Sequence, residues 1–119
     1  MFNGAGMTDI LVRIQGRNVF IAECKIWNGQ KAFSSAIDQL LSYLVWRDTK
    51  AALILFIREA DVSSIIEKAD QALRAHSNFK RPGAESGDPS TRRNFVLHQA
   101  GDSEREIKVA LLPVAIRRD

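Results

Sequence analysis

Two apolar stretches close to the N-terminus set the pattern of this chain. Residues 8–14 alternate, with Ile10, Val12 and Ile14 on one side, whereas residues 19–25 begin apolar on both sides. Alternation with a period of two is typical of a strand, and a two-sided apolar run is typical of a strand covered on both faces. The polar residues between the stretches include glycine and asparagine, which favour turns. The pattern therefore predicts a hairpin.

Helical and strand-like patterns alternate over the rest of the chain. The predicted elements are helices over 31–48 and 61–76 and strands over 51–57, 94–99 and 106–116. The polar segment 78–91, which contains proline and glycine, is predicted to be a loop. The order β-β-α-β-α-β-β predicts an α/β fold with a mixed central sheet flanked by helices, in a single domain over residues 1–119.

Composition narrows the class of protein. Of 119 residues, 45% are hydrophobic and 26% charged, as in a globular domain. No apolar run approaches the roughly 20 residues that span a bilayer, the first residues do not resemble a signal peptide, and a single cysteine cannot form an internal disulfide. We expect a cytoplasmic protein without a membrane partner.

The charge balance permits contact with nucleic acid. The net charge is +3 and the sequence pI about 9.4, which suits phosphate backbones but equally describes an ordinary, mildly basic surface. Basic pairs adjoin the predicted loop, and we expect them to contact nucleic acid: Lys80, Arg81, Arg92 and Arg93.

Three charges within the predicted hairpin need an explanation. Asp9 lies near the start of its first strand, and Glu23 and Lys25 lie near the end of its second strand. A three-residue turn over 15–17 would set Asp9 opposite Glu23, whereas a two-residue turn over 16–17 would set it opposite Cys24. Directly opposed residues share a face, so only the first register brings the carboxylates together, with Lys25 on the same side.

Paired carboxylates of this kind have a definite chemistry. Two carboxylates repel unless a proton or a cation lies between them, and Mg²⁺ or Mn²⁺ is held by such groups. Asp9 and Glu23 would bind the ion, the Cys24 backbone carbonyl offers a third oxygen, and Lys25 could orient the attacking water in phosphodiester hydrolysis. The alternative is a surface pair of Glu23 with Lys25, worth about 0–1 kcal/mol.

These residues resemble the motifs of a known family. The segment 6–11, Gly-Met-Thr-Asp-Ile-Leu, and the segment 23–25, Glu-Cys-Lys, are similar to the acidic-strand and E-x-K motifs of the PD-(D/E)XK nuclease superfamily, which has the restriction-endonuclease-like fold. The resemblance implies metal ligands at Asp9 and Glu23 and a catalytic lysine at Lys25. It is strongest over residues 4–57.

The first predicted helix extends the resemblance. Its segment 39–43, Gln-Leu-Leu-Ser-Tyr, is similar to the Gln-x-x-x-Tyr element of exonuclease-like members. This similarity implies that Gln39 assists at the active site and that Tyr43 approaches the nucleic acid. Both residues also lie along the flank of the apolar stripe of this helix, at the border between core and cleft.

The chain departs from the family pattern at its start. Many members have a helix before the acidic strand, often with a further acidic residue, and only a few residues precede the motif here. We therefore expect a fragment of a longer protein, or a homodimer or other partner that supplies the missing part. The expected function is a Mg²⁺-dependent nuclease acting on DNA. The alternative is an inactive nuclease-like domain that binds nucleic acid or mediates dimerisation.

Overall fold

The computed structural model describes residues 8–14, 17–44 and 49–116, with their side chains from Ile21 onward. Along the chain the elements are β1 (Thr8–Ile14), β2 (Arg17–Ile26), α1 (Gln30–Tyr43), β3 (Lys50–Ile57), α2 (Val62–Ala75), β4 (Phe79–Pro82), β5 (Arg93–Gln99) and β6 (Asp102–Ala115). No helix in these ranges is long and apolar enough to cross a membrane.

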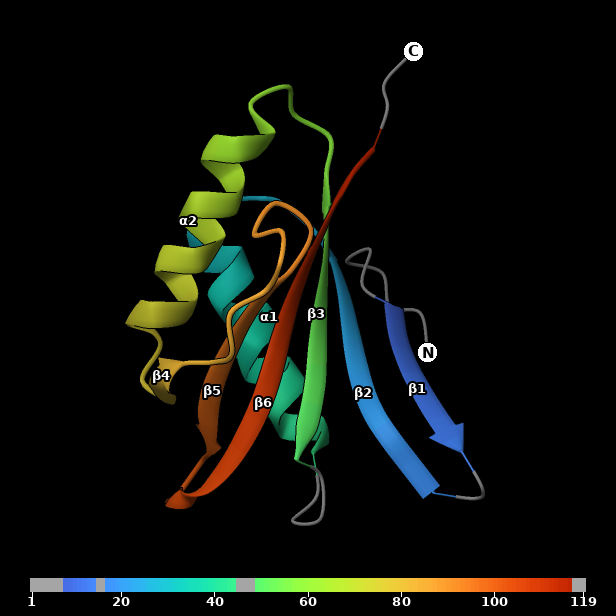
Figure 1. The fold of residues 1–119 in the computed structure, drawn as a ribbon, viewed down its shortest axis with the longest axis vertical. Coiled ribbons are helices and arrows are strands. Elements are labelled where there is room, and N and C mark those ends of the chain that lie inside the picture. Colours follow the sequence, from blue (N-terminus) through green and yellow to red (C-terminus); the bar gives the residue numbers. More distant parts are fainter. Residues whose placement is uncertain (1–7, 15–16, 45–48, 117–119) are drawn as a thin grey trace.

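The strands form one mixed sheet in the order β1-β2-β3-β6-β5-β4 (Figure 1). β2, β3 and β6 run parallel to one another, and the remaining neighbours are antiparallel. The crossover from β2 to β3 passes through α1, as a parallel pair requires. The predicted α/β class with a mixed sheet and two helices is therefore confirmed.

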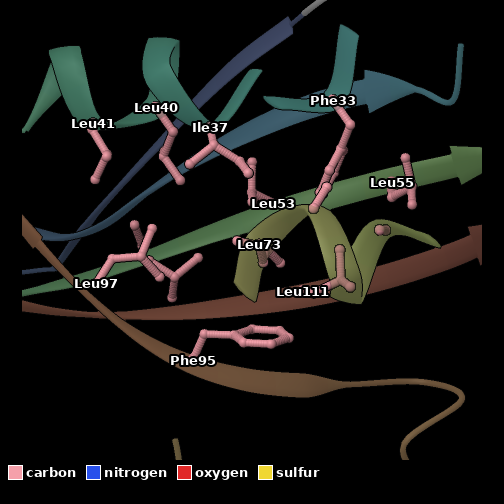
Figure 2. Packing of buried hydrophobic residues seen from close by; sticks show 14 of the residues in the cluster. Phe33, Ile37, Leu40, Leu41, Leu53, Leu55, Leu73, Phe95, Leu97 and Leu111 are labelled. Carbon is pink, nitrogen blue, oxygen red and sulfur yellow. The ribbon is translucent and has the colours of Figure 1, made fainter. Parts of the chain in front are cut away.

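Both helices cover the same face of the sheet. One cluster of buried side chains joins α1 and α2 to alternate residues of the central strands, such as Leu53 and Leu55 of β3 and Leu111 of β6 (Figure 2). The intervening residues Ile54 and Phe56 point to the opposite face and are only partly buried. The sheet thus has one face under the helices and one face that neither helix covers.

Three differences from the sequence-based prediction go beyond a shift of one or two residues. α1 ends at Tyr43 because Leu44 is extended, with φ −82° and ψ 135°; residues 45–48, to which the helix was predicted to extend, lie outside the described ranges. The predicted loop 78–91 contains an additional strand, β4, which pairs with β5, so the predicted element order is wrong at this point. β6 begins at Asp102, earlier than predicted, because the β5–β6 turn is tight and uses Gly101 at φ 81°.

The β1–β2 hairpin has an unexpected construction. Next to the turn, Ile14 pairs with Arg17, so the turn is neither of the two that the sequence suggested. A bulge between Val12 and Arg13 then shifts the register by one residue. Beyond this bulge Asp9 pairs with Glu23. The three-residue turn predicted the same pairing, but in the structure the bulge produces it and not the length of the turn.

Because the core lies on one side of the sheet, replacing different side chains of β6 by alanine should lower the free energy of unfolding by unequal amounts. Leu111 is 0% exposed beneath the helices, so Leu111→Ala should lower the free energy of unfolding by about 2–5 kcal/mol. Val114, which is 40% exposed, is the control, and Val114→Ala should cost less than about 1 kcal/mol. Urea denaturation measures both values, and equal losses would contradict this arrangement of the core.

Candidate active site

Glu23 lies in β2 between two paired strands. It pairs with Asp9 of β1 on one side and with Leu53 of β3 on the other. Its neighbour Leu53 belongs to the core beneath the helices, so Glu23 projects from the helix-covered face, where it is 0% exposed. The alternative of a solvent-exposed Glu23–Lys25 pair is therefore wrong for Glu23.

Asp9 is described by its backbone register alone. Residues directly opposed in an antiparallel pair share a face, with Cβ atoms about 4.5–5.5 Å apart. Asp9 and Glu23 are therefore directly opposed, which is the register that the sequence analysis required for a carboxylate pair. Its side chain lies outside the described part of the structure.

Lys25 and Cys24 take opposite sides of β2. Lys25 is two residues beyond Glu23, so it projects from the same face, and it is partly exposed. The Cys24 side chain is buried on the other face. The Cys24 backbone pairs with Thr8, the first residue of β1, and its carbonyl as a third metal ligand stays a prediction.

The orientation of α1 places Gln39 and Tyr43 on the flank away from α2. Asp38 on the other flank lies at the end of α2, with an oxygen 2.6 Å from Nε2 of His76, the residue that follows that helix. At 100° per residue, Tyr43 lies about 140° round the helix from Asp38. Since α1 packs on β2 and β3, the flank away from α2 is the one on the side of β1. The Gln39 Nε2 donates to the Tyr43 hydroxyl at 2.5 Å, which ties the two side chains together.

The position of Gln39 along α1 can be compared with the position of Glu23 along β2. α1 packs on β2 and runs in the opposite direction (Figure 1). Gln39 lies about 14 Å from the start of α1 at 1.5 Å per residue. Glu23 lies about 10 Å before the end of β2 at 3.3 Å per residue. Both residues therefore lie well away from the connection between β2 and α1, and the grouping of Gln39 with Glu23 stays a prediction.

The donor set is of the kind that a hard divalent cation takes. Mg²⁺ prefers carboxylate and carbonyl oxygens and keeps several waters. Glu23 provides one buried carboxylate, and the residue opposite it is a second acid. Among the side chains that the structure describes, which do not include that of Asp9, no three His, Cys, Asp or Glu form a metal-binding group.

Lys80 and Arg81 of β4, two of the predicted nucleic-acid contacts, already bind a carboxylate of the protein. Arg81 donates to both carboxylate oxygens of Glu106, at 2.8 and 2.6 Å, and the Lys80 ammonium lies 3.0 Å from the same carboxylate. The hydrogen bond from Arg81 is the main reason that the pKa of Glu106 falls from 4.5 to about 2. Phosphate contact by these two cations would compete with Glu106.

The other two predicted contacts differ from each other. Arg93 bonds to Glu67 at 2.8 Å and to Asp70 at 3.1 Å, and the bond to Glu67 is the first cause of its raised pKa. Arg92 instead donates through Nε to the Asn94 side chain at 2.8 Å. Arg93 therefore serves to join α2 to β5, while the remaining donors of Arg92 can reach a ligand.

Sequence reasoning missed two groups of residues. Asp70, only 8% exposed, forms ion pairs with Arg93 and with Arg74 of its own helix. An aspartate on a predicted helix is ordinarily exposed, so the sequence did not indicate these ion pairs. Lys50 and Lys108 lie side by side on β3 and β6. Their adjacency depends on the parallel pairing of two strands distant in sequence, which the local sequence pattern does not reveal.

The pKa of Glu106 predicts a small acid-dependent loss of stability. A carboxylate whose pKa is lower in the folded than in the unfolded state stabilises the fold above the unfolded value and loses that contribution as the pH falls. The loss should run from about pH 4.5 down to about pH 2. Urea midpoints across this window should fall less in Glu106→Gln than in the unmodified protein, and identical pH profiles would contradict the role of the ion pairs.

The comparisons with known proteins identify no relative. No protein-family model matches the sequence, and no curated protein and no solved structure matches it either.

Proposed function

We propose that this protein is a divalent-metal-dependent nuclease that hydrolyses phosphodiester bonds of DNA. The single observation that supports this most is the β1–β2 register, in which Asp9 lies directly opposite the fully buried Glu23. The order of the motifs and the resemblance to the PD-(D/E)XK superfamily, with its restriction-endonuclease-like fold, support the same function. Gln39 and Tyr43, on the flank of α1 toward β1, are the proposed helix contribution.

Each residue has a specific role in the proposed reaction. Asp9 and Glu23 would hold the metal through their carboxylates, together with the Cys24 carbonyl. When bound, Mg²⁺ or Mn²⁺ would polarise the phosphate and lower the pKa of a water molecule. Lys25 Nζ orients the attacking water and offsets the negative charge that develops on the phosphate. The Gln39 amide, fixed by its bond to Tyr43, positions these groups, and Tyr43 contacts the nucleic acid.

The exposure of the residues indicates where a substrate would enter. Glu23 has no exposed surface, while Lys25, two residues closer to the end of β2, is partly exposed. A phosphate would therefore approach from the Lys25 end of the strand. Metal binding next to Glu23 requires the neighbouring side chains to admit the ion and its waters.

The same burial favours a second candidate function. A carboxylate with no exposed surface is also compatible with a purely structural role, and Lys80, Arg81 and Arg93 are engaged with acids of the protein itself. The second candidate is a catalytically inactive domain that binds nucleic acid or dimerises. Metal binding that depends on Glu23 separates the two functions.

Paired substitutions test the proposed roles. Glu23→Gln should abolish Mn²⁺ binding in calorimetry and cleavage of DNA together, because it removes a ligand charge without changing the size of the side chain. Lys25→Met should retain Mn²⁺ binding but slow cleavage by about 10²–10³-fold, since it removes only transition-state stabilisation.

The control for these variants is Glu104→Gln, at an exposed position, which should behave like the unmodified protein. Circular dichroism verifies that each variant is folded. Full cleavage by Glu23→Gln would rule out the proposed site. DNA binding without any Glu23-dependent Mn²⁺ binding in the unmodified protein would favour the inactive domain.

Removal of the competing acid tests whether Lys80 and Arg81 contact DNA. Glu106→Gln removes the carboxylate that both cations bind, so DNA should bind more tightly and the slope of log K against log salt should steepen by about 0.9 for each new phosphate contact. Glu104→Gln changes the net charge equally and should have a smaller effect. Equal effects in fluorescence-anisotropy titrations would exclude these two residues as contacts.

A further inference from the structure

A pocket lies on the face of the sheet that the helices leave uncovered. It is open and has a volume of about 360 Å³. Its floor includes Ala52, Val96 and Ala110, which alternate with residues of the core beneath the helices. Glu23 projects from the opposite face, so the sheet separates this pocket from the candidate active site.

Three cations surround this apolar floor. Lys50 and Lys108 are direct partners in the parallel β3–β6 ladder, and Arg92 approaches from the segment between β4 and β5. No acidic side chain is among the described residues that line the pocket, and in the described ranges none of the three cations forms an ion pair. Like charges on adjacent strands repel each other, and a bound anion would relieve this repulsion.

Hydrogen bonds hold one wall of the pocket in place. The Gly83 N–H donates to the Asn94 carbonyl at 2.9 Å, and the Asn94 side-chain amide donates to the Ala84 carbonyl at 2.9 Å. A Cβ on Gly83 would come within 2.9 Å of Asn94 backbone and Cβ atoms, so only glycine permits this close approach.

The same Asn94 positions a cation. Its side-chain oxygen accepts from Nε of Arg92 at 2.8 Å, which orients the guanidinium next to the pocket. The terminal nitrogens of a guanidinium form two parallel hydrogen bonds to a phosphate or carboxylate. Arg92 is thus oriented before any ligand binds.

We propose that this pocket binds a phosphate monoester carried on a compact, partly apolar molecule, of which a nucleoside monophosphate is the representative. A phosphate monoester carries a charge of about −1.5 to −2 at neutral pH, which matches three converging cations better than the single charge of a carboxylate. The apolar floor would contact the rest of the ligand, and the volume lies within the range of small-molecule sites, roughly 300–1,000 Å³. This site does not depend on the proposed nuclease activity.

Calorimetry on the full chain tests the site with AMP, inorganic phosphate and adenosine as probes. AMP should bind more tightly than either of the others, because only AMP carries both the charge and the apolar part. Lys50→Gln and Lys108→Gln should each weaken AMP binding by about tenfold. Lys68→Gln, on the exposed side of α2, is the matched charge control and should have no effect.

Amide chemical shifts add a readout that needs no variant. On addition of AMP, the amides of Ala52, Val96 and Ala110 should shift. A dinucleotide with a 5′-phosphate that binds as well as AMP would identify the end of a strand as the source of the phosphate, and weaker binding would identify a free nucleotide. Equal binding of AMP and adenosine, an equal loss in Lys68→Gln, or shifts confined to other residues would overturn the proposal.

Discussion

A carboxylate that lies wholly inside the protein constrains the N-terminal half of this chain. Glu23 is fully buried beneath α1, in a strand that is paired on both sides. Burial of a charge costs several kcal/mol unless hydrogen bonds or an opposite charge compensate it. The register of β1 decides which residue faces Glu23, because a slip by one residue would turn Asp9 to the other face of the sheet. The bulge after Val12 therefore determines that Asp9 lies opposite Glu23 at the other end of the hairpin.

The elements that could be predicted are those whose signal is local. The apolar stripe of α1 and the two-sided apolar run of β3 define those elements directly from sequence. The Asp9–Glu23 pairing was also predicted, but through a turn that the structure does not use, since the bulge restores the register. β4 could not be found because four residues ending in proline form a strand only through their pairing with β5. The adjacency of Lys50 and Lys108 arises from tertiary pairing alone.

The two faces of the sheet differ in charge and in covering. The helix-covered face contains the buried acid, with Lys25 near the end of its strand, and the uncovered face contains Lys50, Lys108 and a neighbouring arginine over an apolar floor. Three further basic residues, Lys80 and Arg81 of β4 and Arg93 of β5, form ion pairs with carboxylates of β6 and α2. A mildly basic composition is thus divided into cations that stabilise the fold and cations available to anions. The second group can bind an anion without first releasing a carboxylate of the protein.

Diffraction from a crystal grown with Mn²⁺ tests the central claim most directly. The proposed site predicts one anomalous peak between the side chains of Asp9 and Glu23, within coordinating distance of both carboxylates and near Lys25. A peak elsewhere only, or no peak with the Asp9 and Glu23 side chains pointing apart, would contradict the assignment of these residues as a metal site.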